Sequence, residues 1–506
     1  MLSATTSPLS PAPFSPSSVV LPPPPVYDPS AMRYHADPLA DETIAAIVGS
    51  WELPPGEINL PALLALNSDR LSHLRTTTML LNLWTSNAAL DGWSPPVGTP
   101  PHIVAALHNY LDVGRVLPEW ADPVKIARGE NVFTAHGPLS VMSLFCASLP
   151  DCYVQPKASA VLQISGQLTT NADYRIRSTA AMVFPVMLRG GLTTPEGLGV
   201  AQTLKVRLIH ATIRNLILHG APEAMINAVV PPVSNLAPAP VALTTGTDGV
   251  AASAMQSMHG AFMANGWNVV RDGLPNNQEQ LVFTLLTFHY VFLRALRTLG
   301  IGLCTEDEEA YLHCWNVVGS VLGIEQKWMP FTYADAERLF VEIQAHCLAD
   351  HVYPGGTDAR PALGGALVDY LSASIPFKLV KPFPALFTRY LCGNAVADAL
   401  GVTDNQSLVS RSLFAVLMGV CRLIDYTVRL VIPQFSLARM FSRVVGYHLL
   451  TSFLMDQTRP LKLPTHLLTQ IHTTVSTWDD DPKAPRWLNR MEDRMTIRGS
   501  WSSHAR

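Results

Sequence analysis

Apolar residues recur with the period of an α-helix along most of this 506-residue chain, from about residue 41 to about residue 471. No stretch alternates apolar and polar residues for long enough to predict a β-sheet. The chain can also supply a large core, because 48% of its residues are hydrophobic and only 15% are charged. We therefore expect an all-α protein with a single large domain over residues 41–475.

Capping and turn signals divide this domain into helices. Thr305 with Glu308 has the spacing of a capping box, and Thr332 with Asp335 gives a similar helix start. The main predicted helices are 71–88, 138–147, 160–168, 175–188, 195–219, 276–299, 305–322, 332–349 and 383–400.

A turn separates two of these helices. Gly190-Gly191 predicts the C-terminal cap of helix 175–188, and Thr194-Pro195 predicts an N-cap and a first-turn proline for helix 195–219. Pro185 predicts a kink or an end in the first of the two.

Three segments fall outside the helical pattern. Residues 1–40 are rich in Ser, Thr and Pro, which predicts a disordered or surface-wrapping arm. Residues 221–263 carry several proline and threonine-glycine breaks, which predict a loop insertion. Residues 476–506 form a polar C-terminal tail.

The charge and the cysteines of the chain indicate which partners and which cellular compartment to expect. The net charge is −4 and no basic block occurs, so no nucleic-acid partner is expected. The seven cysteines are scattered without a C-x-x-C pair, which argues against a disulfide framework or a zinc site and favours a reducing compartment. No secretory signal is visible, so a cytoplasmic location is expected, or a periplasmic or secreted one if a native leader was removed.

The most apolar late segment, Leu413 to Ile432, contains Arg422, Asp425 and Arg429. Three charges within about 20 residues argue against a membrane-spanning helix. Peripheral contact with a membrane stays open, and so does the choice between monomer and homodimer.

One predicted helix carries a histidine between two arginines. At about 3.6 residues per turn, His210 shares a face with Val206 and Ile213, while Arg207 and Arg214 lie one turn to either side of it. The imidazole is therefore expected to point inward with apolar neighbours. Such a residue is either an ordinary buried histidine, which helical geometry alone favours, or the axial ligand of an apolar cofactor with acidic arms, such as haem.

The common catalytic motifs are absent. The sequence contains no G-x-G-x-x-G, Walker A loop, G-x-S-x-G elbow or H-E-x-x-H, and no paired Glu-x-x-His motif of a di-iron bundle. His210 and its surroundings are therefore what the sequence offers for chemistry.

Three short stretches around His210 carry a family resemblance: RIRSTA at 175–180, GGL at 190–192 and VRLIHA at 206–211. They resemble the haem-dependent oxygenase family of latex clearing proteins, or rubber oxygenases, to which the ER-bound oxygenase of the mycophenolic acid pathway also looks related. Weaker similarities downstream, such as YLHCWNVVG at 311–319, extend the resemblance over roughly residues 122–468.

The resemblance implies a helical core with globin-like packing around haem b. In it, His210 matches the proximal iron ligand, and Arg175 and Thr179 match pocket residues on the preceding helix. Residues four apart share a helical face, so Arg175 and Thr179 can reach one cavity, where the arginine would pair a haem propionate or polarise dioxygen. The alternatives are an ion pair for Arg175 and a back-bonded hydroxyl for Thr179. Arg207 and Arg214 would serve the propionates or lie in solvent.

Two positions depart from the rubber oxygenases. Ser178 stands where they typically have a lysine that can cap the iron, and serine is too short and too weak a ligand for that. Ser178 nevertheless belongs to the predicted catalytic set with Arg175 and Thr179. The region that matches their glutamate base reads QPKASA at 155–160, without an acid. A base that removes an allylic proton needs a carboxylate or imidazole in reach, so this argues against polyisoprene cleavage by their mechanism.

Three further histidines, His136, His289 and His313, lie on or near apolar stretches. Each is expected to be a hydrogen-bonded core or rim residue, with a distal base as the less common alternative.

The expected function is a haem b oxygenase that acts with dioxygen on an apolar, isoprenoid-like or otherwise unsaturated small molecule. Two alternatives stay open: a peroxide-dependent haem enzyme on the same scaffold, and a non-catalytic haem-binding sensor or carrier.

Overall fold

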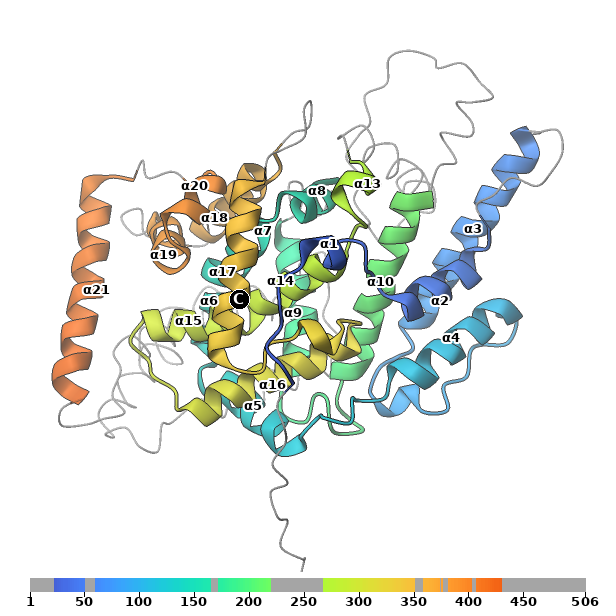
Figure 1. Cartoon of the computed structure of the whole chain (residues 1–506), viewed down its shortest axis with the longest axis horizontal. Coiled ribbons are helices and arrows are strands. Elements are labelled where there is room, and N and C mark those ends of the chain that lie inside the picture. The colour runs from blue at the N-terminus through green and yellow to red at the C-terminus, as the bar shows by residue number, and fades with distance from the viewer. Residues whose placement is uncertain are drawn as a thin grey trace, which may run out of the picture.

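The computed structural model describes residues 22–50, 60–164, 172–219, 267–350, 358–373, 375, 381–402 and 406–429. Helices are the only regular secondary structure in these ranges, which contain no β-strand, and this confirms the all-α prediction (Figure 1). The buried side chains form one continuous hydrophobic cluster that runs from Met32 to Val402, as expected for a single domain.

The helices of the first half are α1 (Pro29–Met32), α2 (Pro38–Val48), α3 (Leu60–Leu81), the 3-10 turn η1 (Ala88–Leu90), α4 (Pro101–Gly114), α5 (Pro123–Ala135), α6 (Gly137–Ser143), the π-helix η2 (Leu144–Ser148), α7 (Leu149–Tyr153), α8 (Pro156–Ile164), α9 (Ala172–Met187) and α10 (Gly199–His219).

The helices of the second half are α13 (Val269–Asp272), α14 (Gln278–Phe288), α15 (Tyr290–Thr298), α16 (Thr305–Val321), the 3-10 turn η3 (Gln326–Trp328), α17 (Tyr333–Ala349), α18 (Arg360–Ala373), α19 (Phe383–Cys392), α20 (Asn394–Ala399) and α21 (Leu408–Arg429).

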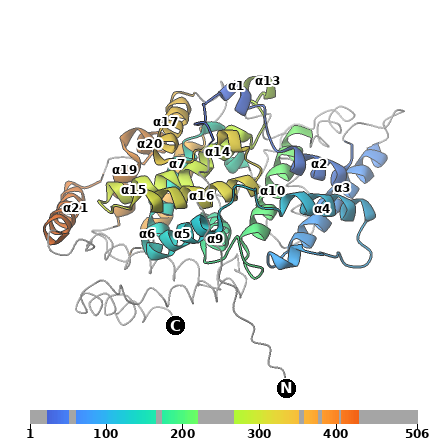
Figure 2. The same cartoon turned by 60° about the horizontal axis from the view of Figure 1, so that its bottom comes forward.

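Helices α5 and α16 lie side by side and make the most extensive helix–helix contact in the described part of the chain (Figure 2). Gly129 allows this approach: a Cβ at that position would lie 2.7 Å from the carbonyl oxygen of Ala310 and 2.8 Å from the Cβ of Cys314. On one side of this centre α10 packs against α9 and α2, with α3 and α4 at that edge of the molecule. α21 stands at the opposite edge.

The described part of the N-terminal arm, residues 22–40, wraps around the helical body. Met32 is fully buried, and the Nε of Arg33 donates to a carboxylate oxygen of Glu279 at 2.5 Å. Residues 1–21 and the predicted insertion at 221–263 lie outside the described residues, and so does the predicted C-terminal tail, residues 476–506.

α10 begins four residues later than predicted. Gly190 has a φ of +73° and follows the end of α9, as a C-terminal glycine should. The hydroxyl of Thr194, however, donates to the carbonyl of Gly190 and does not cap a helix. The cap comes from a distant residue, since the side-chain oxygen of Asn87 accepts from the two N–H groups that follow Gly199. The predicted start at Pro195 is therefore wrong.

The two predicted capping signals have different outcomes. Thr332 caps α17 by accepting from the N–H of Asp335 at 3.2 Å, as predicted. At α16 the N-cap is Cys304, without a side-chain cap, and Glu308 forms an ion pair with Arg297 at 2.6 Å. The predicted capping box is wrong because the glutamate has a tertiary partner that local spacing does not reveal.

Two predicted helices are each split. The helix expected over 276–299 is interrupted at His289, between α14 and α15, and the helix expected over 383–400 is interrupted at Gly393, which has a φ of +88°. Within the described ranges, one helical stretch, Gln278–Thr298, is long and apolar enough to cross a membrane, and 72% of its most apolar window is buried, as in a core helix. One bent pair, Pro123–Ala135 with Leu139–Tyr153, passes the same test as a single unit.

Candidate functional site

α10 carries His210 on its less buried side. The helix buries a stripe that includes Leu204, Arg207 and Arg214, whereas His210 lies beside half-buried Val206 and is itself half-buried. Sequence periodicity placed the histidine on the inward face and the arginines at its edge. In the structure the arginines belong to the buried face of α10 and His210 lies beside that face, because Arg207 and Arg214 are paired with acidic residues.

Those partners are the two acids at the start of α2. Arg207 donates to both carboxylate oxygens of Asp37, at 2.6 and 2.7 Å, and to the carbonyl of Val321. Arg214 donates to both oxygens of Asp41, the shortest bond being 2.6 Å, and to backbone carbonyls of the turn before α14. Neither guanidinium lies in solvent, and their donors are directed at the protein. We therefore do not retain Arg207 and Arg214 as propionate ligands.

α9 packs against α10 and carries the other predicted site residues. Ser178 and Thr179 are half-buried, between Ile176 and Ala180, which are buried. Arg175 lies on the same helix, and its side chain is outside the described residues. The structure thus brings the RIRSTA helix and the histidine helix together.

Segment 155–160 stands where the rubber oxygenases are expected to have their glutamate base, and two of its side chains are engaged in structural contacts. The hydroxyl of Ser159 is fully buried and donates to the carbonyl of Tyr153 at 2.7 Å. The ammonium group of Lys157 lies 3.2 Å from a carboxylate oxygen of Asp350 and 3.8 Å from one of Asp272. Neither side chain supplies an acid or a base to a reaction.

The three other histidines make backbone hydrogen bonds, as expected of core or rim residues. His136 bonds through Nδ1 to the carbonyl of Val132 at 3.0 Å. His313 accepts from the N–H of Asp122 at 2.9 Å, and burial lowers its pKa to about 4. His289 is fully buried, which lowers its pKa to about 3, and its Nδ1 accepts from the following N–H. These low pKa values keep His289 and His313 neutral at physiological pH.

Sequence reasoning missed a buried acid, Glu130, on α5. It is 1% exposed, and one carboxylate oxygen accepts from the N–H of Gly190 at 2.9 Å, while the other has no hydrogen-bond partner. Burial raises its pKa to about 7, against the opposing effect of the backbone N–H groups at Gly190 and Gly191. The signal was available, because Ile126, Glu130 and Phe133 share one helical face and only one of them is polar.

A second buried acid, Asp151 on α7, belongs to a buried polar network with residues of α15 and α17. It is paired with Arg294 and accepts from the side-chain amide of Gln344 at 2.8 Å. Burial raises the pKa of Asp151, and the guanidinium of Arg294 opposes that rise. The pair joins α7, α15 and α17, which is a structural role.

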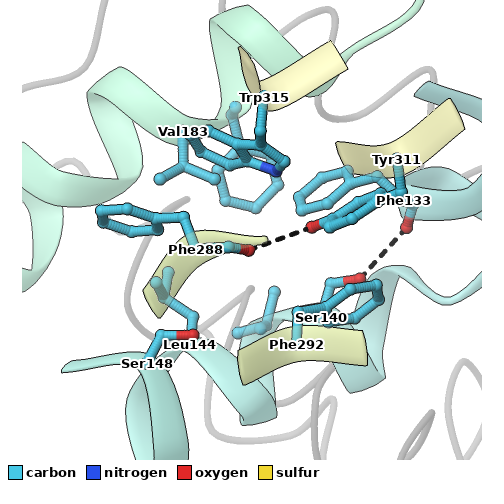
Figure 3. Close-up of a pocket in the computed structure, with 11 residues that line it drawn as sticks. Phe133, Ser140, Leu144, Ser148, Val183, Phe288, Phe292, Tyr311 and Trp315 are labelled. Carbon is cyan, nitrogen blue, oxygen red and sulfur yellow. Dashed lines mark hydrogen bonds between the residues drawn. The ribbon is translucent and has the colours of Figure 1, made fainter. Parts of the chain in front are cut away.

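An aromatic cavity lies between the α5–α16 pair and the end of α9. The space between its lining atoms is about 330 Å³, part of it open to solvent. Figure 3 shows rings from several helices converging on it. The lining residues are Phe133, Ser140, Val141, Leu144, Ser148, Val183, Phe184, Phe288, Phe292, Tyr311 and Trp315.

No group of three or more His, Cys, Asp and Glu side chains that could hold a metal ion by themselves occurs in the described ranges. The cysteines whose side chains are described are all free thiols, three of them buried. The candidate site therefore consists of His210 on α10, Ser178 and Thr179 on α9, and the neighbouring aromatic cavity.

Comparisons with known proteins point to one family. Residues 239–423 match the model of the catalytic domain shared by the ER-bound oxygenase mpaB/B′ and rubber oxygenase. The chain is also 24% identical over 385 residues to the rubber oxygenase of Streptomyces sp. (strain K30), a match that covers 74% of this chain and 73% of that protein.

The fold has a counterpart among solved structures. A structure of latex clearing protein in the closed state is similar with a TM-score of 0.51 and 20% sequence identity, and the match covers 90% of this chain and 91% of that one. These findings support an oxygenase. The stretch matched by the family model begins after His210, so the roles of His210 and of the α9 residues rest on the local resemblance and on the geometry described above.

Proposed function

We propose that this chain, which is similar to rubber oxygenase and to the mpaB-type ER-bound oxygenases, is a haem b-dependent oxygenase that uses dioxygen on an apolar, unsaturated small molecule. The observation that carries the proposal is the half-buried imidazole of His210 on the helix that packs against the RIRSTA helix.

The side chains of α9 and α10 fit such a cofactor. An imidazole nitrogen is a ligand that iron accepts, and the residues on the same face of α10, Val206 and Ile213, are apolar. His210, Ser178 and Thr179 are half-buried on two helices that pack together, so each retains accessible surface that a bound apolar cofactor would cover. The arginines at 207 and 214 are paired elsewhere, so Arg175 remains as the propionate partner suggested by the resemblance.

Bound haem would supply the iron at which dioxygen reacts, and the protein would supply ligation, orientation and a dry surrounding. His210 would hold the iron from α10. The hydroxyl of Thr179 would orient dioxygen from α9, and Arg175 would pair a propionate. The buried aromatic residues beyond Thr179 would exclude water from the site.

Ser178 and the segment 155–160 are the two places where the proposed site differs from that of the rubber oxygenases. Ser178 cannot cap the iron as a lysine does. Ser159 and Lys157 are occupied by structural contacts, so this segment provides no base for an allylic proton. We accordingly propose a smaller apolar substrate than polyisoprene, oxidised without proton removal by that segment.

The first test is the ultraviolet-visible spectrum of the purified, haem-supplemented protein. We expect a Soret band in the native protein and in His102→Ala, a control at an exposed histidine of α4, and a lost or shifted band in His210→Ala. An identical Soret band in His210→Ala would contradict the ligand assignment.

The second test is turnover. Dioxygen and a panel of unsaturated isoprenoids and fatty acids should yield a carbonyl or hydroxylated product. Product with hydrogen peroxide and none with dioxygen would replace the proposal by a peroxide-dependent enzyme. A Soret band without product under either oxidant would replace it by a haem-binding sensor or carrier.

A further inference from the structure

We propose that the aromatic cavity beside α9 is a docking site for dioxygen on its way to the haem site. This inference rests on the proposed function, because it assigns a place to the oxidant of that reaction. Three properties of the cavity support it: its apolar surface, its size and its position on α9.

The surface of the cavity is apolar because its polar atoms are directed at the backbone. The hydroxyl of Ser140 donates to the carbonyls of His136 and Phe133, at 3.1 and 3.2 Å. The hydroxyl of Tyr311 donates to the carbonyl of Phe288 at 3.5 Å. Figure 3 shows this bond and the bond between Ser140 and Phe133. What faces the cavity is therefore mainly aromatic carbon and aliphatic side chains.

Two polar groups remain among the lining residues. The indole N–H of Trp315 has no hydrogen-bond partner, and Ser148 contributes a hydroxyl. Figure 3 shows these two residues on opposite sides of the cavity. A buried water needs two to four polar partners, and the hydroxyls of Ser140 and Tyr311 already bond to the backbone, so an apolar molecule is favoured.

The size of the cavity selects a small molecule. Most of the space between its lining atoms lies in narrow crevices, and the free interior accommodates a molecule about as large as water or dioxygen. The π-helix η2 forms one wall with its first and last residues, Leu144 and Ser148. π-helical turns are rare and occur often at functional sites.

The position of the cavity connects it with the proposed haem site. Val183 and Phe184 of α9 line it, and Val183 lies one helical turn after Thr179 on the same face. One turn corresponds to a rise of about 5.4 Å, so the cavity and the half-buried face of α9 are neighbours. Ten of the eleven lining residues are buried and Phe288 is half-buried, so entry from solvent would pass Phe288.

Xenon tests the cavity without reference to activity, because it binds dry apolar cavities of this kind. We expect the haem-loaded native protein to bind xenon next to Val183 in a crystal under xenon pressure. Val183→Phe should abolish that binding, and the milder Val183→Ile should reduce it. Val341→Phe, the same change at an exposed position of α17, should leave it unchanged. Native protein without xenon at this position would overturn the inference.

Steady-state kinetics then test the role of the cavity. Val183→Phe and Val183→Ile should raise the KM for dioxygen, by about threefold or more for phenylalanine, with kcat at saturating dioxygen and the KM of the organic substrate little changed. A raised KM for the organic substrate alone would show that the cavity holds that substrate, and unchanged constants would show that dioxygen takes another route. Either result overturns the inference while the proposed function stands.

If xenon binds and no oxygen-dependent turnover exists, the proposed function fails, and the assignment of the cavity to dioxygen fails with it.

Discussion

At the scale of single residues, burial shifts the pKa of several groups, and the direction of the shift separates groups that stay neutral from a group that titrates near neutral pH. His313 and His289 are held neutral by burial and bond to the backbone, so they maintain the fold. Glu130 is the contrasting case, because its carboxyl group has a free oxygen and a pKa raised to about 7. A carboxyl group with that pKa holds or releases its proton near neutral pH.

We predict that Glu130→Gln removes a pH dependence of stability. The pKa of Glu130 rises from an ordinary value of 4.5 to about 7 on folding, so its contribution is most favourable below about pH 4.5 and is lost as the pH rises through about 7. At pH 8 the glutamine variant should be more stable than the native protein by up to about 3 kcal/mol, and at pH 4 the two should be similar.

Urea unfolding of both proteins between pH 4 and pH 8 measures this difference. Two stability curves that stay parallel over the whole range would show that Glu130 does not titrate as described.

At the scale of secondary-structure elements, the site depends on how closely its helices approach one another. The α5–α16 pair forms one side of the aromatic cavity through Phe133, Tyr311 and Trp315. Its spacing depends on Gly129, where any side chain would meet the backbone of α16. A backbone contact cannot be relieved by turning a side chain, so the two helices would have to separate.

We predict that Gly129→Ala lowers the free energy of unfolding by about 1–3 kcal/mol, since overpacking outweighs the gain in helix propensity. Gly365→Ala is the matched control: Gly365 also lies inside a helix, α18, but nothing lies within 4 Å of an added Cβ. The control should be neutral or stabilise by up to about 1 kcal/mol. Denaturant unfolding measures both, and equal effects of the two substitutions would refute the close-contact explanation.

At the scale of the whole molecule, the N-terminal segment is tied to the helix that carries His210. The two ion pairs that join α2 and α10 each link residues about 170 positions apart in the sequence. Breaking a buried pair on one side leaves an uncompensated charge, which is more costly than removing both partners.

We predict that Arg207→Met destabilises the protein by about 3–5 kcal/mol, and that Arg207→Met combined with Asp37→Leu recovers much of that loss. Because Arg207 faces Asp37, the double variant should keep its affinity for haem. Denaturant unfolding and haem titration measure the two quantities. If the double variant folds stably but no longer binds haem, Arg207 would have to be reassigned as a propionate ligand.

The amino-acid sequence by itself determined the all-α class, most helix positions, the C-terminal glycine after α9 and the resemblance to the rubber oxygenases, because periodicity, capping residues and short motifs are local properties of the chain. The start of α10 required Asn87, the interruption at His289 appeared only in the fold, and the burial of Arg207 and Arg214 required Asp37 and Asp41. The aromatic cavity likewise became visible only in the fold, and so did the contact of Glu130 with Gly190. Each of these depends on groups far apart in sequence, whose contacts exist only once the helices have packed.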